Sequence, residues 1–437
     1  MHSSSALRAS RHVGLGLTGL PATLGRRACH FSSYQKIPAG REAVIVSAAR
    51  TPIGSFGGSL AEVKGTKLGS IAIAAAVQRA GIPGEYVQEA YLGSVCQANL
   101  GQAPARQAVM GGGLGQSCVA TTVNKVCASG MKATALAAMG IQCGLNDITV
   151  AGGFESMSNV PYYLEKGRFG GYRYGNGTLV DGMVHDGLWD AYGNFHMGVA
   201  AEKCAHDYDI TREDQDQHAI DNYLRARDAI RKGYFNAEIC PVTITGKKGN
   251  IVISEDEEPS KVKIEKIKTL RTAFKPQNES QEPSVTAATS SSLNDGGGAM
   301  VIMSAARAKE LGVKPLARIV SYADAEQAPV DFTTAPSLAI PKALKYAGLT
   351  VSDIDLWEIN QAFSVVSLAN MKILDLDPTK VDVAGGAVAL GHPIGCSGAR
   401  IIITLLHNLR RLDKTMGCAG ICNGGGGASA IVIERLN

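Results

Sequence analysis

Asn294-Asp-Gly-Gly-Gly-Ala-Met-Val-Ile-Met303 and Asn423-Gly-Gly-Gly-Gly-Ala-Ser-Ala-Ile-Val-Ile433 are two versions of one pattern, a glycine-rich turn that leads into an apolar strand. The first closes one half of the chain and the second closes the other. This repetition predicts two related α/β halves that join near Ser304–Lys314. Glycine-rich turns resemble one another easily, so chance similarity is the alternative.

The segments around these turns alternate between short apolar runs and longer helix-like runs. The expected strands cover residues 43–49, 90–92, 119–123, 147–151, 317–323, 356–359 and 417–421. The expected helices cover residues 66–80, 129–143, 336–347, 362–374 and 397–411. Strands that alternate with helices of this length predict parallel sheets covered by helices.

Residues 161–284 differ in composition from the rest of the chain, since they are richer in aromatic and charged side chains. We expect them to form a long loop domain that leaves the first half and covers the site, with a helix near Arg212–Lys232. The acidic run Glu255–Glu258 is expected to be a solvated loop. The first half then comprises residues 39–160 and 285–308, and the second half residues 309–437.

The N-terminal segment carries most of the positive charge. The formal net charge is +4, and residues 1–41 contain six Lys or Arg and no acidic residue. A basic, serine-containing leader without acids is typical of a mitochondrial transit peptide, here residues 1–38, with a processing region around Arg26–Ser33. A disordered basic tail is the alternative. The remaining body is about neutral, which argues against nucleic-acid binding, and no apolar run is long enough to predict a membrane span.

The first chemical motif is Asn124-Lys-Val-Cys-Ala-Ser-Gly-Met-Lys-Ala133, where a strand ends and Ser129-Gly130 opens a helix. A cysteine at a helix N-terminus feels the positive end of the helix dipole, which favours the thiolate. Free backbone N–H groups at such a place can also hold an oxyanion. Cys127 is therefore a candidate nucleophile. The same pattern also fits a buried structural cysteine.

The second motif is Gly385-Gly-Ala-Val-Ala-Leu-Gly-His-Pro-Ile-Gly-Cys-Ser-Gly-Ala-Arg400. His392 lies between Gly391 and Pro393, so it is expected on a tight turn that presents the imidazole. Such a ring could accept the thiol proton and then donate a hydrogen bond. A structural histidine is the alternative. A metal pair with Cys396 is disfavoured, because Pro393 prevents regular helical spacing and no third ligand is near.

Two further motifs lie at predicted strand ends. Cys422 stands beside four glycines in Gly420-Ile-Cys-Asn-Gly-Gly-Gly-Gly-Ala428, and an apolar packing role is its alternative. Asn360 opens Asn360-Gln-Ala-Phe363 at a position that looks like a helix N-cap, where asparagine is usually structural.

Together these four motifs resemble the thiolase family over nearly all of residues 42–437, and its mitochondrial members that act on acetoacetyl-CoA most of all. Three further stretches carry the closer resemblance: Arg50-Thr-Pro-Ile-Gly-Ser-Phe56, Gly152-Gly-Phe-Glu-Ser-Met-Ser158 and His196-Met-Gly198. The resemblance implies a layered α-β-α-β-α core with the loop domain over the active site. It also implies reversible acetyl transfer, in which two acetyl-CoA give acetoacetyl-CoA and CoA through an acetyl-cysteine.

The resemblance also implies a role for each motif residue. Cys127 would take the acetyl group, and His392 would activate it and contribute to an oxyanion hole for the thioester enolate. Asn360 would hold the water that completes that hole. Cys422 would move the proton at the acetyl α-carbon. The N–H groups of Cys127 and Gly424 would form the second oxyanion hole.

Substrate and ion positions follow from the same resemblance. The substrate and CoA positions are His196, Met197, Tyr223, Ser291 and Phe332, with Asp331-Phe332 in a segment linked to 2-methyl-branched substrates. A potassium ion would be held by Tyr223, Ala287, Ala288, Ser290 and Val388, with Ser290 where relatives tend to have alanine. Coenzyme A would be a substrate rather than a covalent cofactor. The expected assembly is a homotetramer in the mitochondrial matrix.

One position departs from the family pattern. The family usually has Asn-Glu-Ala-Phe where this chain has Asn360-Gln361-Ala-Phe363, which alters the local charge and could lower turnover. Three other functions stay open: a longer-chain 3-ketoacyl-CoA thiolase, a ketoacyl synthase, and a catalytically silent binding subunit. The direction of the reaction in the cell and the acceptance of 2-methyl-branched substrates also stay open.

Overall fold

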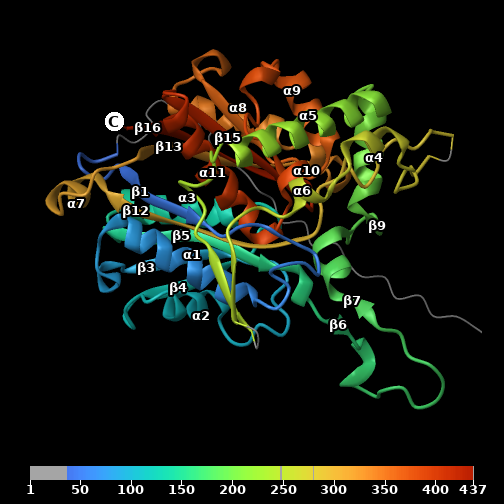
Figure 1. Ribbon diagram of the computed structural model, residues 1–437, viewed down its shortest axis with the longest axis horizontal. Coiled ribbons are helices and arrows are strands. Elements are labelled where there is room, and N and C mark those ends of the chain that lie inside the picture. Colours follow the sequence, from blue (N-terminus) through green and yellow to red (C-terminus); the bar gives the residue numbers. More distant parts are fainter. Residues whose placement is uncertain (1–36, 247–248, 279, 437) are drawn as a thin grey trace, which may run out of the picture. The chain divides into compact units, whose positions relative to one another are not determined.

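Two sets of strands and helices, one from each half of the chain, form the core of the computed structural model, which describes residues 37–246, 249–278 and 280–436 (Figure 1). The first half contributes strands β1 (Ala43–Arg50), β2 (Gly54–Ser55), β3 (Glu89–Gly93), β4 (Val119–Val123), β5 (Ile148–Ser156) and β12 (Asn294–Ser304), and helices α1 (Gly65–Ala80), α2 (Pro104–Gly111) and α3 (Ser129–Gln142). After α7 (Ala305–Glu310), the second half contributes β13 (Ala317–Glu326), β14 (Leu356–Ile359), β15 (Met416–Asn423), β16 (Gly427–Arg435), α8 (Pro336–Ala347), α9 (Ser364–Leu374), α10 (Ala387–Leu390) and α11 (Ile394–Arg411).

The two halves order their strands in the same way. The first half runs β1-β12-β5-β3-β4 and the second runs β13-β16-β15-β14. In each half the first two pairings are antiparallel and the next is parallel. The halves meet where β1 pairs antiparallel with β13, so that one continuous sheet results. The predicted duplication is confirmed. The prediction of parallel sheets is wrong for β12 and β16, which run antiparallel to both neighbours. The glycine-rich run after Asn423 is a turn between β15 and β16 as expected, whereas the run after Asn294 lies within β12 itself.

A matching irregularity also marks the duplication. The pairing of β1 with β12 shifts register just before Ser47, and the pairing of β13 with β16 shifts just before Ser321. Such a bulge turns a side chain out of the regular alternation. Ser47 Oγ donates to the carbonyl oxygen of Ala76 in α1 at 2.6 Å, and Ser321 Oγ donates to that of Ala343 in α8 at 2.8 Å. Each half therefore ties its first strand to the helix that follows it.

Helices α3 and α11 cross between the two halves at a point where only glycine fits. A Cβ atom added to Gly130 would lie 2.7 Å from the backbone nitrogen of Ala399, and one added to Gly398 would lie 2.4 Å from that of Met131. Helices α1 and α2 pack on β1, β3, β5 and β12, whereas α8 packs on β13, β15 and β16. Figure 1 shows α1 and α2 on one side and α8 and α9 on the other. The predicted α-β-α-β-α layering is confirmed.

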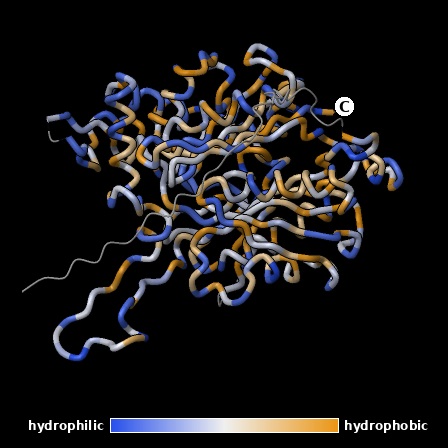
Figure 2. Tube along the Cα trace, turned by 180° about the vertical axis from the view of Figure 1, so that it is seen from behind, coloured by the Kyte–Doolittle hydropathy of each residue, from blue (hydrophilic) through white to orange (hydrophobic). Residues whose placement is uncertain are grey.

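The long excursion between β5 and β12 consists of short elements. They are β6 (Tyr162–Tyr163), β7 (Val180–Asp181), β8 (Trp189–Asp190), β9 (Phe195–His196), α4 (Met197–Asp207), α5 (Arg212–Arg231), β10 (Val242–Gly246), β11 (Gly249–Ile253) and α6 (Glu258–Lys261). Helix α5 begins where predicted because Thr211 and Asp214 form a capping box. Figure 2 shows that the loop between β6 and β7 is largely pale or blue, whereas orange, apolar residues are frequent throughout the core.

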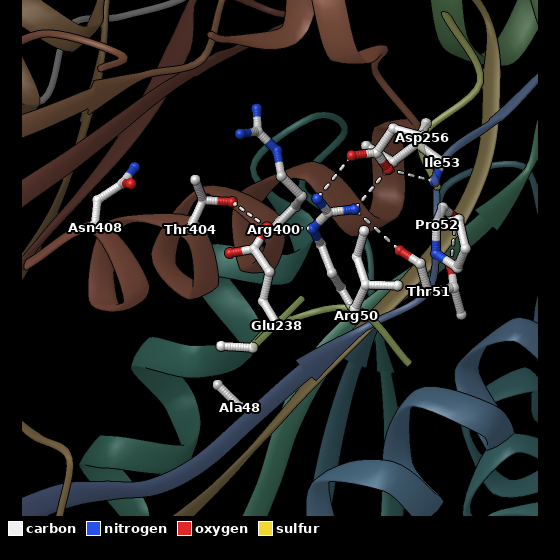
Figure 3. Close-up of polar contacts among 12 residues, drawn as sticks. Ala48, Arg50, Thr51, Pro52, Ile53, Glu238, Asp256, Arg400, Thr404 and Asn408 are labelled. Atoms are coloured by element: carbon white, nitrogen blue, oxygen red, sulfur yellow. Dashed lines mark hydrogen bonds and ion pairs between the residues drawn. The ribbon is translucent and has the colours of Figure 1, made fainter. Parts of the chain in front are cut away.

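The acidic run at residues 255–258 is not the solvated loop expected from the sequence. Asp256 is 3% exposed and accepts two hydrogen bonds from the Arg50 guanidinium, at 2.7 and 2.8 Å (Figure 3). Arg50 Nε also donates to Glu238 at 2.6 Å. A buried charge needs such partners. Arg50 lies far away in the sequence, so the acidic run alone could not reveal this ion cluster.

Most predicted elements are confirmed, with differences at their ends. Strands β4 and β14 and helix α8 have the predicted bounds, whereas β5 runs on to Ser156 and α11 begins at Ile394. Helix α9 begins at Ser364, so Asn360 follows a strand and is not the N-cap expected. The predicted transit peptide falls almost wholly outside the described residues. No helix within the described ranges is both long and apolar enough to cross a bilayer.

Candidate active site

Seven of the predicted catalytic and substrate residues line one cavity of about 300 Å³. They are Cys127, His196, Met197, Ser291, Phe332, His392 and Gly424, and Ser290 from the proposed ion site joins them. Asn360, Cys422 and Tyr223 do not line it. Residues that the sequence did not single out complete the wall, among them Met157, Met183, Leu188, Phe274, Leu293 and Phe363. The cavity is mostly apolar, as sites for small organic ligands usually are.

Cys127 follows a strained turn between β4 and α3. Val126 has a φ of +47°, which is unfavourable for a β-branched residue and persists only when its surroundings enforce it. Ser129 supplies that support, because its Oγ accepts from the Lys125 N–H at 2.8 Å and donates to the Val126 carbonyl at 2.6 Å. The turn therefore fixes the Cys127 side chain at the cavity.

The resting state of Cys127 differs from the expectation. Burial raises the pKa of the Cys127 thiol to about 11, although the backbone N–H groups of Gly424 and of Cys127 itself favour the thiolate. Desolvation of the sulfur therefore outweighs the helix-start effect, and the group is a thiol at neutral pH. The same two N–H groups lie beside the sulfur. They are therefore placed to donate to the carbonyl oxygen of a bound thioester when negative charge develops on that oxygen.

The backbone of His392 is held by a residue of the other half. Gly391 has a φ of +103°, and a Cβ there would lie 2.5 Å from the Asn294 side chain, so the turn requires glycine. The His392 N–H donates to Asn294 Oδ1 at 2.8 Å. Asn294 is itself fully buried. The predicted tight turn at His392 is thus present and rigid.

The hydrogen bonds of Ser397 set the protonation of the His392 ring. Ser397 Oγ donates its single hydrogen to the Pro393 carbonyl at 2.9 Å and lies 2.6 Å from His392 Nδ1. Nδ1 must therefore carry a hydrogen and donate it to Oγ, which leaves Nε2 with a free lone pair. Nε2 is buried and has no partner among the described residues. Burial, aided by Arg400, lowers the pKa of His392 to about 3, so the ring is neutral and available as a base.

The two asparagines that open the repeated glycine-rich pattern support the two catalytic turns. Asn294, from the first half, holds the His392 backbone of the second half. Asn423, from the second half, accepts a hydrogen bond from Lys125 Nζ at 2.9 Å. Lys125 belongs to the first half and lies two residues before Cys127. Neither asparagine was expected to have a function. Their equivalent positions in the repeat were the signal that could have revealed them.

Asn360 and Cys422 lie behind the cavity wall. The Asn360 N–H donates to the Gly420 carbonyl at 2.9 Å, which joins the end of β14 to β15. Both polar atoms of the Asn360 carboxamide are buried without a partner among the described residues. An unsatisfied buried carboxamide is costly and indicates a polar ligand at that place. Cys422 is fully buried, and burial together with the nearby Cys127 raises its pKa.

His196 and Phe274 form the wall that comes from the excursion. His196 Nδ1 accepts from the Gly198 N–H at 3.1 Å and so caps α4, while its ring stacks on Phe274 with centroids 4.9 Å apart. Burial lowers the pKa of His196, so the ring is neutral with its hydrogen on Nε2. His196 and His392 therefore have opposite tautomers. Phe274 was missed because no motif surrounds it in the sequence.

The residues proposed for potassium are only partly gathered. Tyr223, Ala288 and Val388 belong to one buried cluster and do not line the cavity, whereas Ala287 is exposed. Ser290 Oγ donates to the Thr286 carbonyl at 2.7 Å. In the described ranges no three or more His, Cys, Asp or Glu side chains form a group suited to a metal ion. Any monovalent cation here would depend on carbonyl and hydroxyl oxygens.

Comparisons with known proteins identify the family of the chain. The model of the thiolase N-terminal domain matches residues 43–306, and that of the thiolase C-terminal domain matches residues 313–435. A probable acetyl-CoA acetyltransferase of Dictyostelium discoideum is 58% identical over 90% of this chain and 94% of its own. A mitochondrial acetyl-CoA acetyltransferase of Bos taurus is 54% identical over 92% of this chain and 94% of its own. A thiolase from Ascaris suum, solved in complex with coenzyme A, superposes with a TM-score of 0.84 at 44% identity, covering 90% of this chain and 100% of that one. The chain therefore belongs to the thiolase family.

Proposed function

We propose that the protein is an acetyl-CoA acetyltransferase that forms and cleaves acetoacetyl-CoA through an acetyl group on Cys127. One observation carries the proposal: the Cys127 thiol and a neutral His392 with a free Nε2 lone pair line the same cavity. Relatives more than half identical over most of the chain are named acetyl-CoA acetyltransferases, which supports the same reaction.

In the first half-reaction the Cys127 sulfur attacks the thioester carbonyl of acetyl-CoA while His392 Nε2 takes the thiol proton. The negative charge that develops on the carbonyl oxygen is stabilised by the N–H groups of Cys127 and Gly424. The bond between the acetyl carbon and the CoA sulfur then breaks. CoA leaves as a thiol after it receives the proton from His392, and Cys127 remains as an acetyl thioester.

In the second half-reaction the Cys422 thiol first passes its proton to His392 Nε2, and the Cys422 thiolate then removes a proton from the methyl carbon of another acetyl-CoA. The enolate oxygen is stabilised by the Nε2–H that His392 now carries and by a water that the unpartnered Asn360 carboxamide would hold. The enolate carbon attacks the acetyl carbonyl on Cys127, the new carbon–carbon bond forms, and the Cys127 sulfur leaves and takes the proton from His392. A raised pKa makes the Cys422 thiolate a stronger base, which suits proton removal from carbon. Thiolysis of acetoacetyl-CoA is the reverse sequence.

The cavity wall supports a short acyl group. Met197 and Phe332 are buried and pack in one cluster with Cys422, so side chains fill the space beyond the reacting carbons. A longer-chain 3-ketoacyl-CoA is therefore disfavoured. Acceptance of a 2-methyl branch is a separate part of the proposal that depends on Phe332. Thiolysis rates for acetoacetyl-CoA, its 2-methyl analogue and a long-chain 3-ketoacyl-CoA distinguish these substrates directly.

A potassium ion is a further part of the proposal. Tyr223, Ala288 and Val388 pack together beside the segments that carry Ser290 and His392, so an ion held there would stiffen both. The expected result is faster thiolysis in potassium chloride than in sodium chloride at equal ionic strength. Equal rates in the two salts would remove potassium from the proposal and leave the reaction unchanged.

A homotetramer is supported by two exposed features. Strand β4 ends the sheet, and its Val119 is 57% exposed, which suits pairing with a second copy. The loop between β6 and β7 exposes Phe169 and Tyr174. Light scattering should give a tetramer mass for the wild type and a smaller mass for Phe169→Ser/Tyr174→Ser. A monomeric wild type would contradict the assembly.

A mitochondrial matrix location is supported by the composition of the leader. Relatives of similar identity are named either mitochondrial or cytosolic, so the leader rather than the enzyme body decides the compartment. A reporter fused to residues 1–41 should be imported by isolated mitochondria. A reporter that stays outside would favour a cytosolic enzyme.

The reaction itself is tested by incubating the protein with acetyl-CoA and mapping the acetyl group by mass spectrometry. An acetyl thioester on the peptide that contains Cys127, lost again on addition of CoA, is the expected result. Absence of this adduct, together with no thiolysis of acetoacetyl-CoA, would favour the alternative of a catalytically silent binding subunit.

A further inference from the structure

Asp382 hydrogen-bonds to the residues on both sides of Asn360. It is 1% exposed and has a φ of +46°, a strained conformation for a residue other than glycine. Its Oδ1 accepts from the Ile359 N–H at 3.0 Å, and its Oδ2 accepts from Gln361 Nε2 at 2.7 Å. One buried carboxylate thus fixes the residue before Asn360 and the residue after it.

Gln361 extends this contact to the segment that carries His392. Gln361 Oε1 accepts from the Val388 N–H at 3.3 Å, four residues before His392. Its Nε2 also donates to Asn222 Oδ1 at 2.8 Å, and the same oxygen accepts from the Gly386 N–H at 3.2 Å. A Cβ on Gly386 would lie 2.3 Å from Gln361 Cδ, so the carboxamide fits closely against this backbone.

The directions of these hydrogen bonds explain the departure from the family pattern. Gln361 Nε2 donates to two acceptors, Asp382 Oδ2 and Asn222 Oδ1. A glutamate at this position, which is more usual in the family, would present an oxygen to both of them. Two carboxylates would then face each other in a buried place, where one of them must take up a proton. In this chain the carboxamide at 361 therefore matches the carboxylate at 382.

We propose that Asp382 and Gln361 are a pair of positioning residues that hold Asn360 and His392 in the geometry of the enolate-binding oxyanion hole, an inference that rests on the proposed function. Neither residue lines the cavity, so each acts through Asn360 and His392. In the described structure neither Asp382 nor Gln361 hydrogen-bonds to Cys127 or Gly424, whose backbone N–H groups would form the second oxyanion hole. The pair should therefore matter more for carbon–carbon bond chemistry than for acetyl transfer to Cys127.

The test compares the wild type with Asp382→Asn, Gln361→Glu and the double variant in two assays. Exchange of labelled CoA into acetyl-CoA reports acetyl transfer to Cys127, and thiolysis of acetoacetyl-CoA reports the bond chemistry. In each single variant the kcat of thiolysis should fall on the order of tenfold, because two like groups then face each other where a buried hydrogen bond stood. The exchange rate and the KM of thiolysis should change less than about threefold. In the double variant the donor and the acceptor exchange places, so kcat should recover by about threefold or more over either single variant.

Two further measurements separate positioning from lost stability. Ser321→Ala removes a buried hydrogen bond between β13 and α8 outside the cavity lining, and it should lower the unfolding temperature while thiolysis and exchange fall together or not at all. Gln361→Glu should regain activity relative to the wild type as the pH falls, because the introduced carboxyl group, once protonated, can again donate to Asp382.

The inference would be overturned if the single variants lowered exchange and thiolysis equally, or if the double variant were no better than the worse single one. It would also be overturned if Gln361→Glu kept the wild-type pH profile. If a single variant does not fold, the double variant still decides, since a folded and active double variant supports the pair and an unfolded one contradicts it. A wild type that forms no acetyl-Cys127 would instead refute the proposed function.

Discussion

At the scale of single residues, the site joins a thiol that resists ionisation to a histidine that stays neutral. Burial raises the pKa of Cys127 to about 11 and lowers that of His392 to about 3. Neither group is charged at rest, so the cavity can desolvate a thioester without disrupting an ion pair. Ionisation then accompanies attack, when the developing oxyanion is stabilised by backbone N–H groups.

Replacement of the nucleophile gives the first prediction. Cys127→Ala should lower thiolysis of acetoacetyl-CoA by at least on the order of a thousandfold, because no other described thiol lines the cavity. Steady-state kinetics measures the loss, and an unchanged circular dichroism spectrum shows that the fold persists. Activity near that of the wild type would contradict the mechanism.

The second prediction concerns the other cysteine. Cys422→Ala should still form acetyl-Cys127, because the first half-reaction does not use Cys422. Condensation should fall on the order of a hundredfold or more, since proton removal from the methyl carbon loses its base. Mass spectrometry after acetyl-CoA treatment should show the adduct while coupled assays show no acetoacetyl-CoA. Loss of the adduct would assign Cys422 to acyl transfer instead.

The third prediction uses the raised pKa of the thiol. The thiolate is the reactive form, and its fraction rises with pH until the pH passes the folded-state pKa of about 11. Alkylation of Cys127 by iodoacetamide should therefore still accelerate above about pH 9. Cys143 is exposed and serves as the internal control on the same chain. A rate for Cys127 that levels off below about pH 8 would indicate an activated thiolate.

At the scale of elements, the crossing of α3 and α11 fixes the distance between the two catalytic turns. Each helix begins just after its catalytic residue, and each contributes one glycine to the contact. A methyl group at either glycine would meet backbone rather than a mobile side chain. The crossing therefore cannot accommodate an added methyl group without moving backbone, which costs free energy of folding.

The fourth prediction follows from that contact. Gly130→Ala and Gly398→Ala should each lower the free energy of unfolding by about 2–4 kcal/mol, because an added Cβ overlaps the facing backbone. Gly312→Ala is the control, since Gly312 has a φ of +67° but open space around its Cβ position, and it should cost about 1 kcal/mol. Urea titration measures both. Equal losses at the crossing and in the control would show that the helices can move apart.

The elements also show what the sequence could predict. The repeated glycine-rich pattern after Asn294 and Asn423 is local, so the duplication followed from it, and most helices followed from equally local patterns. The hydrogen bonds that these asparagines make were hidden, because their partners at His392 and Lys125 lie about a hundred or more residues away. The burial of Asp256 was hidden for the same reason. The residues that react could be predicted from local motifs, whereas the long-range hydrogen bonds that hold them in place could not.

At the scale of the whole molecule, Glu155 connects the two halves through one buried carboxyl group. It lies in β5, and its Oε2 accepts from the Val95 N–H at 2.9 Å and from the Gly395 N–H of α11 at 3.0 Å. Oε1 accepts more weakly from the Cys96 N–H at 3.3 Å. Burial, partly offset by these N–H groups, raises the pKa of Glu155 to about 7.

The last prediction is that this group makes the folded protein less stable as the pH rises toward neutrality. The unfolded chain releases the Glu155 proton near pH 4.5, whereas the folded protein keeps it until about pH 7. The stabilisation of the neutral form is therefore complete below pH 4.5 and is lost as the pH rises through 7, at a total of about 3 kcal/mol. Glu155→Gln keeps an uncharged acceptor for Val95 and Gly395, so its unfolding free energy should lack this decline. Urea titrations between about pH 5 and pH 8 should show the difference between variant and wild type growing with pH, and parallel profiles would mean that Glu155 is ionised throughout this range.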